Sequence, residues 1–182
     1  LVYSPLASLS VYGAYSQGLE HGGISPITAT NPNQLLDPST SRQQEIGIKT
    51  SLVPDWQMTA ALFQISKSLE VINANNTFVR NGDAVHRGIE LAAQGKLTRD
   101  LTLGLTAMAL QARQRNTGDP AQENQRITNV PAFKSGVTLD YAVPQLAGLK
   151  LNGAWVYSSD KIFSPDTVIH TTIPSYHVVD LG

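Results

Sequence analysis

Apolar and polar residues alternate with a period of two through most of this chain, and this constrains its fold more than any other feature. Such alternation is typical of β-strands that hold one face against an apolar medium and the other against a polar one. It predicts about eight strands, at residues 6–17, 43–53, 56–67, 85–97, 101–113, 132–143, 149–159 and 175–182. We therefore expect an all-β fold in a single domain.

The connections between these strands alternate in length. Those at 54–55, 98–100 and 144–148 are short, whereas those at 18–42, 68–84, 114–131 and 160–174 are long. Outer-membrane barrels have this rhythm, with short periplasmic turns and longer external loops. We therefore expect one antiparallel up-and-down meander in which neighbours in sequence are neighbours in the sheet, as part of a transmembrane β-barrel.

Strand parity predicts which side chains share a face of this sheet. One face takes Ile46, Ile48, Ile89, Leu91, Leu103, Leu105, Val137, Leu139, Leu151 and Trp155. The other takes Glu45, Lys49, Glu90, Asp140 and Lys150. The third strand carries apolar residues on both parities, so parity does not orient it. Aromatic residues on the apolar parity predict two interfacial girdles, with Tyr15, Trp155 and Tyr157 toward the long loops and Tyr141 toward a short turn.

Composition excludes several classes of function. The 13 Lys and Arg against 14 Asp and Glu give no electrostatic case for a nucleic-acid partner. The chain has no cysteine for a disulfide or a thiolate metal site, and no apolar run of the roughly 18 residues that a membrane helix needs. Its four histidines lack catalytic or metal-binding spacing, and no serine lies in a G-x-S-x-G motif. We expect neither an enzyme nor a bound cofactor or metal.

A series of short sequence words follows one order along almost the whole chain. They are 11–20 (VYGAYSQGLE), 44–49 (QEIGIK), 61–65 (ALFQI), 88–91 (GIEL), 129–131 (NVP), 139–141 (LDY), 148–149 (GL), 152–153 (NG), 173–176 (IPSY) and 180–182 (DLG). Their order and spacing resemble the later part of the 22-stranded barrel of TonB-dependent ferric-siderophore receptors. Residues 1–182 thus look like a partial barrel domain without the plug domain, the TonB box and the closing strand.

This resemblance implies a receptor in the bacterial outer membrane that takes up a ferric siderophore. The iron complex is then transported cargo, not a cofactor. The implied partners are the siderophore, outer-membrane lipid and lipopolysaccharide, and the TonB complex acting through the plug domain. Two alternatives remain open: another outer-membrane barrel of the porin or translocator type, and a soluble calyx that binds a small apolar ligand.

Four residues are candidates for contact with the ligand. Tyr12 shares the parity of Ser10, Ala14 and Ser16, which predicts that it points into the lumen, where its ring can pack on a ligand. Tyr12 and Gln17 are expected toward the upper end of their strand, near the external loops. Arg113 and Arg115, at the top of the fifth predicted strand, are expected to meet an anionic complex.

Overall fold

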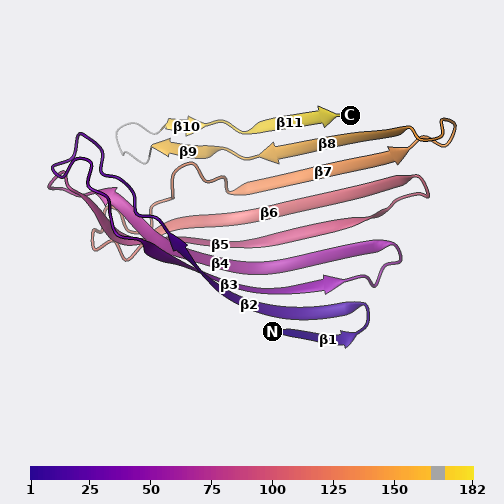
Figure 1. Ribbon diagram of the computed structural model, residues 1–182, viewed down its shortest axis with the longest axis horizontal. Helices are drawn as coiled ribbons and strands as arrows, with labels where there is room; N and C mark the ends of the chain where they lie inside the picture. The colour runs from indigo at the N-terminus through magenta and orange to yellow at the C-terminus, as the bar shows by residue number, and fades with distance from the viewer. Residues whose placement is uncertain (165–170) are drawn as a thin grey trace.

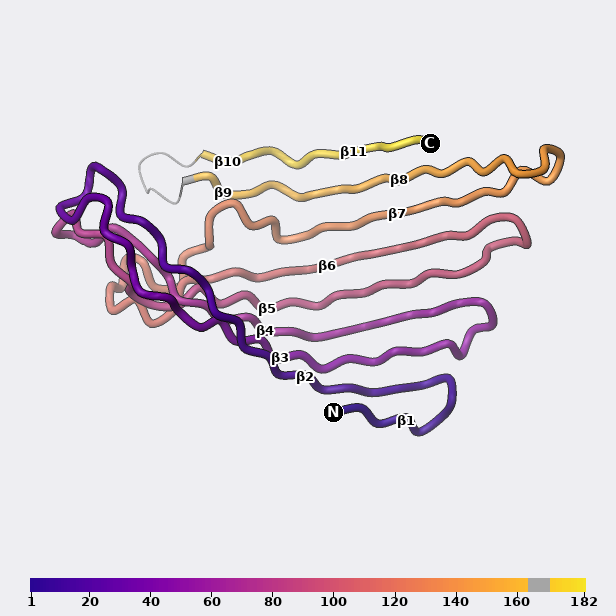
Figure 2. Tube along the Cα trace, in the orientation of Figure 1, coloured from indigo at the N-terminus to yellow at the C-terminus, as the bar shows by residue number. Residues whose placement is uncertain are grey.

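The fold is a single antiparallel sheet, seen in a computed structural model that describes residues 1–164 and 171–182 (Figures 1 and 2). Nine strands pair in the order β1-β2-β3-β4-β5-β6-β7-β8-β11, and β9 and β10 form a separate two-stranded sheet. The strands are β1 (Val2–Leu6), β2 (Leu9–Glu20), β3 (Ser39–Thr50), β4 (Trp56–Ile72), β5 (Phe78–Lys96), β6 (Leu101–Arg115), β7 (Phe133–Ala142), β8 (Lys150–Ser158), β9 (Lys161–Ser164), β10 (Thr171–Ile173) and β11 (Tyr176–Leu181). In the described part of the chain no helix is long and apolar enough to cross a membrane.

The predicted antiparallel meander is confirmed. All eight predicted strands are present, and each pairs with its neighbour in sequence except β8, which pairs with β11 across the β9–β10 hairpin. The short turns lie together at one end of the sheet, on the right in Figure 1, and the longer loops lie at the other end. The alternating connection lengths therefore place all the long loops on one side.

The structure adds β1, which the sequence pattern did not separate from β2. The chain reverses at Ala7 and Ser8, so that Leu6 pairs with Leu9. No Gly, Asn or Asp marks this turn, and these residues are the usual signals for one. In one continuous strand Leu6 and Leu9 would point to opposite faces, whereas the turn brings both to adjoining positions.

A second difference concerns residues 68–84, which were predicted to form a long loop. Here β4 runs on to Ile72 and β5 starts at Phe78, so the connection is a tight turn at the tip of an extended hairpin. The Asn73 side chain caps this turn by accepting hydrogen bonds from the backbone N–H groups of Asn75 and Thr77, both at 3.0 Å. Alternation continues in the β4 half through Leu69 and Val71, but the β5 half, 78–84, does not alternate, so period two alone does not indicate a paired hairpin.

The predicted division of the two faces is confirmed by the register. Ile46 is opposite Leu62, which is opposite Ile89, while Leu105 is opposite Val137, which is opposite Trp155. Directly opposed residues share a face, so the predicted apolar set lies on one side, here called the outer face. The predicted charged set lies on the other side, here called the inner face.

Register also orients β4, which parity had left undecided. Met58, Ala60 and Leu62 lie on the outer face, whereas Phe63 and Ile65 lie on the inner face with Glu45 and Gln43. The inner face of β4 is thus partly apolar, as are Met108 and Leu110 on β6.

The sheet has no conventional hydrophobic core. Among the described residues, the buried apolar positions are four alanines: Ala29, Ala61, Ala84 and Ala112. Large apolar side chains on the outer face are open to the surroundings instead, with 58% of Ile46 and 56% of Leu62 exposed. An apolar sheet face that buries nothing requires an apolar medium, as the wall of a membrane barrel does.

Aromatic rings gather on the outer face of β7, β8 and β11. Trp155 stacks on Tyr157 with ring centroids 6.3 Å apart, and His177 lies 4.9 Å from Tyr157. Phe133 approaches Tyr157 at 6.2 Å. Trp155 and Tyr157 were predicted for the girdle on the loop side, and the structure places them in one cluster there with Phe133 and His177.

We expect Gly88→Ala to destabilise the barrel. A Cβ atom at Gly88 would lie 2.6 Å from the carbonyl oxygen of Ala109 and 2.7 Å from Cζ of Phe63, so the strand or the ring must move. Overpacking of this kind costs about 1–3 kcal/mol, to be measured as the free energy of unfolding of the full-length protein. Gly13→Ala is the matched control because its Cβ would meet no atom closer than 4.0 Å. Equal stabilities of the two variants would contradict this account.

Candidate functional site: the inner face and its loop end

A hydrogen-bonded cluster of polar side chains on β2 and β3 lies on the inner face. The Tyr12 hydroxyl donates to Oε1 of Glu45 at 2.6 Å, and Nε2 of Gln43 donates to Oε2 of the same carboxylate at 3.1 Å. The Lys49 ammonium lies 5.2 Å from the centre of the Tyr12 ring, within cation–π range. The cluster offers a passing ligand an aromatic ring, a carboxylate and a cation together.

Glycines on the neighbouring strands leave space for the aromatic rings of the inner face. Tyr12 is directly opposite Gly47, and a Cβ there would lie 2.6 Å from the Tyr12 ring. Phe63 lies over Gly88 in the same way. Each ring therefore lies down on the backbone of the next strand, which fixes its position without narrowing the lumen by a full side chain.

Tyr12 has the predicted inner-face orientation but lies lower than predicted. It is close to Leu9, where β2 begins at the short-turn end, and β2 continues upward to Glu20. The unpredicted turn at Ala7 and Ser8 moves the strand start, and with it the height of Tyr12. The position is inside the barrel wall, below the external mouth.

Gln17 is not on the inner face. It is opposite Arg42 on the same parity as Tyr15, and its Nε2 donates to the Tyr15 hydroxyl at 2.6 Å. Gln17 lies toward the loop end of β2, as expected, but its side chain is on the outer face. Odd-numbered residues of β2 face outward, and Tyr12 and Gln17 differ in parity.

Arg113 and Arg115 lie at the loop end of β6, as predicted, but on the outer-face parity, opposite Val85 and Asp83. Nη1 of Arg113 donates to the backbone oxygen of Asn124 at 3.1 Å, and Arg115 is 3.7 Å from Glu123. Both arginines thus contact the loop that follows β6. Arg113 also lines a cavity of about 310 Å³ beneath this loop, together with Arg126 and Asp160.

Asn31 is one of several residues that bond the loop between β2 and β3 to the β4–β5 hairpin, together with the backbone of Thr30 and the side chain of Asn76. Asn31 accepts a hydrogen bond from the backbone N–H of Phe78 at 2.9 Å and donates to its carbonyl oxygen at 3.0 Å, as a paired strand residue would. Ser25, only 2% exposed, donates to the same Asn31 oxygen at 3.1 Å. The loop is therefore fixed to the tip of the β4–β5 hairpin.

An ion pair on the β4–β5 hairpin makes further hydrogen bonds to the β2–β3 loop. Glu70 on β4 accepts from the backbone N–H of Gly23 at 2.9 Å and pairs with Arg80 on β5 at 3.2 Å. Arg80 also donates to the backbone oxygen of Asp37. Both ends of the loop are thus bonded to the hairpin, which makes the external mouth a preformed surface on this side.

The sequence analysis missed the Glu45 cluster and the Asn31 clamp for different reasons. Glu45 was placed on the inner face, and a register for β2 and β3 would have brought it beside Tyr12, because Glu45 opposes Ala14. Asn31 lies in an irregular loop, where no periodic signal exists. In the described residues no group of three or more His, Asp or Glu is arranged to hold a metal ion, and His170 lies outside them.

We expect Asn31→Asp to release the β2–β3 loop. Aspartate keeps the shape but loses both donors, and its carboxylate would face the oxygens of Phe78 and Gln34. Leaving such groups unpaired costs about 1–3 kcal/mol, so amide hydrogen exchange in residues 21–38 should speed up by about 5-fold to 150-fold. Asn75→Asp is the control, since Asn75 is exposed and its side chain makes no hydrogen bond within the described residues. Unchanged exchange in the Asn31 variant would show that the clamp does not order the loop.

Solved structures of similar architecture include receptors named for siderophores or their iron complexes. The chain is similar to the ferric preacinetobactin receptor BauA of Acinetobacter baumannii, with 25% identity and a TM-score of 0.76, covering 99% of this chain and 27% of that one. It is also similar to the siderophore receptor PiuA of the same organism, with 22% identity and a TM-score of 0.77 over 99% and 28% of the two chains. The ferric yersiniabactin uptake receptor FyuA of Yersinia pestis matches at 18% identity and a TM-score of 0.77, over 99% and 28%.

The chain therefore spans little more than a quarter of the length of these receptors. No curated protein matches its sequence significantly. The family model for the TonB dependent receptor-like β-barrel matches residues 1–182. With its meander, its two contrasting faces and this match, the chain belongs to the TonB-dependent receptor β-barrel family.

Proposed function

We propose that this chain is part of the barrel wall of an outer-membrane receptor that takes up a ferric siderophore with energy delivered through TonB. The observation that carries the proposal is the contrast between the faces, an exposed apolar outer face and an inner face with the Tyr12–Glu45 cluster. It occurs on a fold shared with three receptors whose names specify siderophores or their iron complexes. We further propose that a plug domain and closing strands complete this barrel in the full-length protein.

Transport of this kind needs no bond to be made or broken, and we propose that the protein is not an enzyme. The siderophore keeps the coordination of its iron, while the wall offers hydrogen bonds and aromatic surface along the path. The polar groups of Tyr12, Gln43 and Glu45 already satisfy one another. A ligand can therefore slide past them without leaving a buried group unpaired.

The alternatives left open by the sequence are less well supported. A porin or a translocator would share the alternating faces, but the family match over residues 1–182 favours the receptor. A soluble calyx needs a polar exterior around an apolar interior. In this chain the polar face carries the aromatic rings that lie over glycines, and the large side chains of the apolar face are exposed. An exposed apolar face does not fit the enclosed apolar interior of a calyx.

The apolar outer face also implies lipid as a neighbour, and we propose lipopolysaccharide as that lipid at the loop end. The proposal rests on orientation, because the long loops of outer-membrane barrels face outward and the outer leaflet is made of this glycolipid.

In the full-length receptor we expect Tyr12→Ala to weaken ferric-siderophore binding by about 1–3 kcal/mol, the loss typical of a desolvated aromatic anchor. Tyr15→Ala is the control because Tyr15 lies on the outer face. Binding would be measured by titration of the detergent-solubilised receptor. Equal affinities of wild type and Tyr12→Ala would assign Tyr12 to the wall alone.

For the arginine pair we expect a loss of similar size, about 1–3 kcal/mol, in an Arg113→Ala and Arg115→Ala double variant. The basis is the cavity that Arg113, Arg126 and Asp160 line beneath the loop, where two guanidinium groups outnumber one carboxylate and so favour an anionic complex. Arg99→Ala, in the turn at the opposite end, controls for the loss of positive charge. Wild-type affinity in the double variant would show that both arginines hold the loop and do not contact the ligand.

A further inference from the structure

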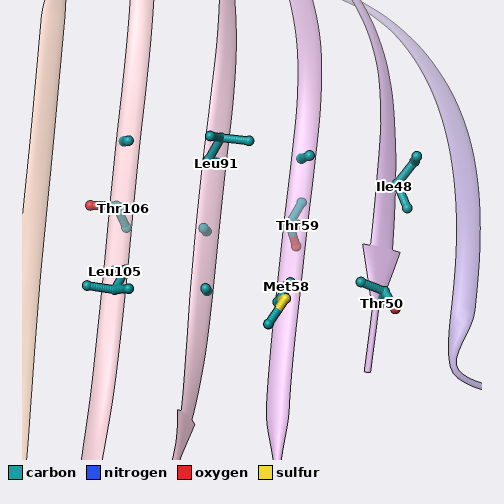
Figure 3. Close-up of a pocket in the computed structure, with 11 residues that line it drawn as sticks. Ile48, Thr50, Met58, Thr59, Leu91, Leu105 and Thr106 are labelled. Carbon is teal, nitrogen blue, oxygen red and sulfur yellow. The ribbon is translucent and has the colours of Figure 1, made fainter. Parts of the chain in front are cut away.

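A groove crosses the outer face over four neighbouring strands, β3 to β6. It has a volume of about 520 Å³, and Figure 3 shows the side chains of Ile48, Met58, Leu91 and Leu105 standing around it on successive strands. Between them lie Ala60, Ala93 and Ala107. The groove is therefore a furrow in a surface that otherwise carries large apolar side chains.

The furrow arises from an exact alternation of large and small residues across the sheet. In one row of opposed residues Ala60 lies between Ile48 and Leu91, and Ala107 follows Leu91. In the next row Ala93 lies between Met58 and Leu105. Large and small side chains thus form a checkerboard, and the alanines mark a continuous depression between the large ones.

Polar residues begin abruptly on the same face toward the loops. The row Ile46, Leu62 and Ile89 is apolar, and the next row is Gln44, Gln64 and Arg87. One row further on comes Arg42, opposite Ser66. The edge of the apolar band therefore falls between two adjacent rows directly above the groove.

Arg42 and Arg87 keep their charge available at this edge. Both are exposed, and Arg87 donates only to the neutral Gln64 side chain, at 2.6 Å. Within residues 1–164 and 171–182, carboxylates form ion pairs with Arg80 and Arg115 and not with these two. Two unneutralised guanidinium groups on alternate strands present a site for an anion at the membrane boundary.

The spacing between groove and arginines fits one membrane leaflet. The stretch of β5 from Ala93 to Arg87 is about 20 Å long at about 3.4 Å per residue. With the tilt of about 40° usual for barrel strands, it covers about 15 Å along the membrane normal. That depth is half of a hydrocarbon core of about 30 Å, so an acyl chain in the groove would place its headgroup at the arginines.

We propose that the outer face of β3 to β6 is a binding site for one phosphorylated, acylated glycolipid of the outer leaflet. One acyl chain lies in the groove over Ala60, Ala93 and Ala107, and Arg42 and Arg87 bind a headgroup phosphate with Gln44 and Gln64 beside them. This inference rests on the proposed outer-membrane location and gives the lipid partner a defined site. Arginine forks suit phosphate oxygens, and no carboxylate opposes them here.

The test uses the purified, delipidated full-length receptor and native mass spectrometry. Three lipids are titrated: lipid A with its phosphates, the same lipid after removal of the phosphates, and phosphatidylethanolamine. We expect one molecule of phosphorylated lipid A to bind more tightly than either of the others. In an Arg42→Gln and Arg87→Gln double variant this affinity should fall about tenfold or more, while dephosphorylated lipid A binds as before. A Lys96→Gln and Arg99→Gln variant, changed at the short-turn end, should bind like wild type.

The groove is tested by filling it, with Ala93→Leu and Ala107→Leu together. Leucine there should weaken both forms of lipid A, because it occupies the space of the acyl chain and leaves the arginines unchanged. Val137→Leu, on the outer face but outside the groove lining, is the size control, and thermal unfolding checks that each variant is folded.

Two results would overturn the site: wild-type affinity for phosphorylated lipid A in both the charge and the groove variants, or equal binding of phosphatidylethanolamine by wild type. Either would reduce the groove to ordinary lipid-facing surface. Ferric-siderophore binding is measured on the same preparation. Failure of the wild type to bind any ferric siderophore would count against the proposed function, while the lipid site is judged on lipid selectivity alone.

Discussion

Consecutive residues of each strand face opposite media, one apolar and one polar. The rest of the structure depends on the strand register that keeps each side chain on its own face. A shift of one residue in any strand would turn its apolar side chains inward and its charges outward. The pairing runs without interruption from Leu9 to Glu20 along β2 and β3, and across β5 and β6 from Asp83 to Lys96. The irregularities fall at the margins, between Tyr3 and Leu6 and between Ser68 and Glu70. The central band, where a slip would cost most, therefore has no bulge in its described pairings, and the loop end tolerates one.

Side-chain size is distributed differently on the two faces. Inside, an aromatic ring opposes a glycine, as in Tyr12 with Gly47 and Phe63 with Gly88, so that a large group lies flat. Outside, in two rows across β3 to β6, large residues oppose alanines, and the difference in height stays open as a groove. The inner arrangement preserves a lumen, because rings that stood upright would narrow it. The hollows of the outer face do not destabilise the fold in a lipid bilayer, because lipid chains fill them. In a protein core, other side chains would have to fill the same space.

The sequence alone predicted the strands, their order and their faces, because one physical rule, the period of two, governs all of them. It failed where that rule has no force. The β5 half of the β4–β5 extension, 78–84, does not alternate, and the turn at Ala7 and Ser8 contains no Gly, Asn or Asp. The four candidate ligand residues illustrate the same limit. Tyr12 was oriented correctly by parity, whereas its height depended on the strand start, and Gln17 was grouped with Tyr12 despite its opposite parity. The Asn31 clamp joins positions far apart in sequence through side-chain geometry that no pattern encodes.

Parity also separates the arginines into groups that overall charge cannot distinguish. Arg42, Arg87, Arg113 and Arg115 all lie on the outer-face parity toward the loops, yet their surroundings differ. Arg113 and Arg115 are engaged by the loop after β6, and their charge reaches the rim through that loop. Arg42 and Arg87 lie within the paired stretches of β3 and β5, and the apolar band begins one or two rows below them. An anion approaching from above meets the first pair, and an anion anchored in the leaflet by its own acyl chain meets the second. Both proposed partners are anionic, so charge alone does not separate them. The direction from which each one arrives, set by the strand and row that carry the charge, and the acyl chain that the groove would hold both distinguish them.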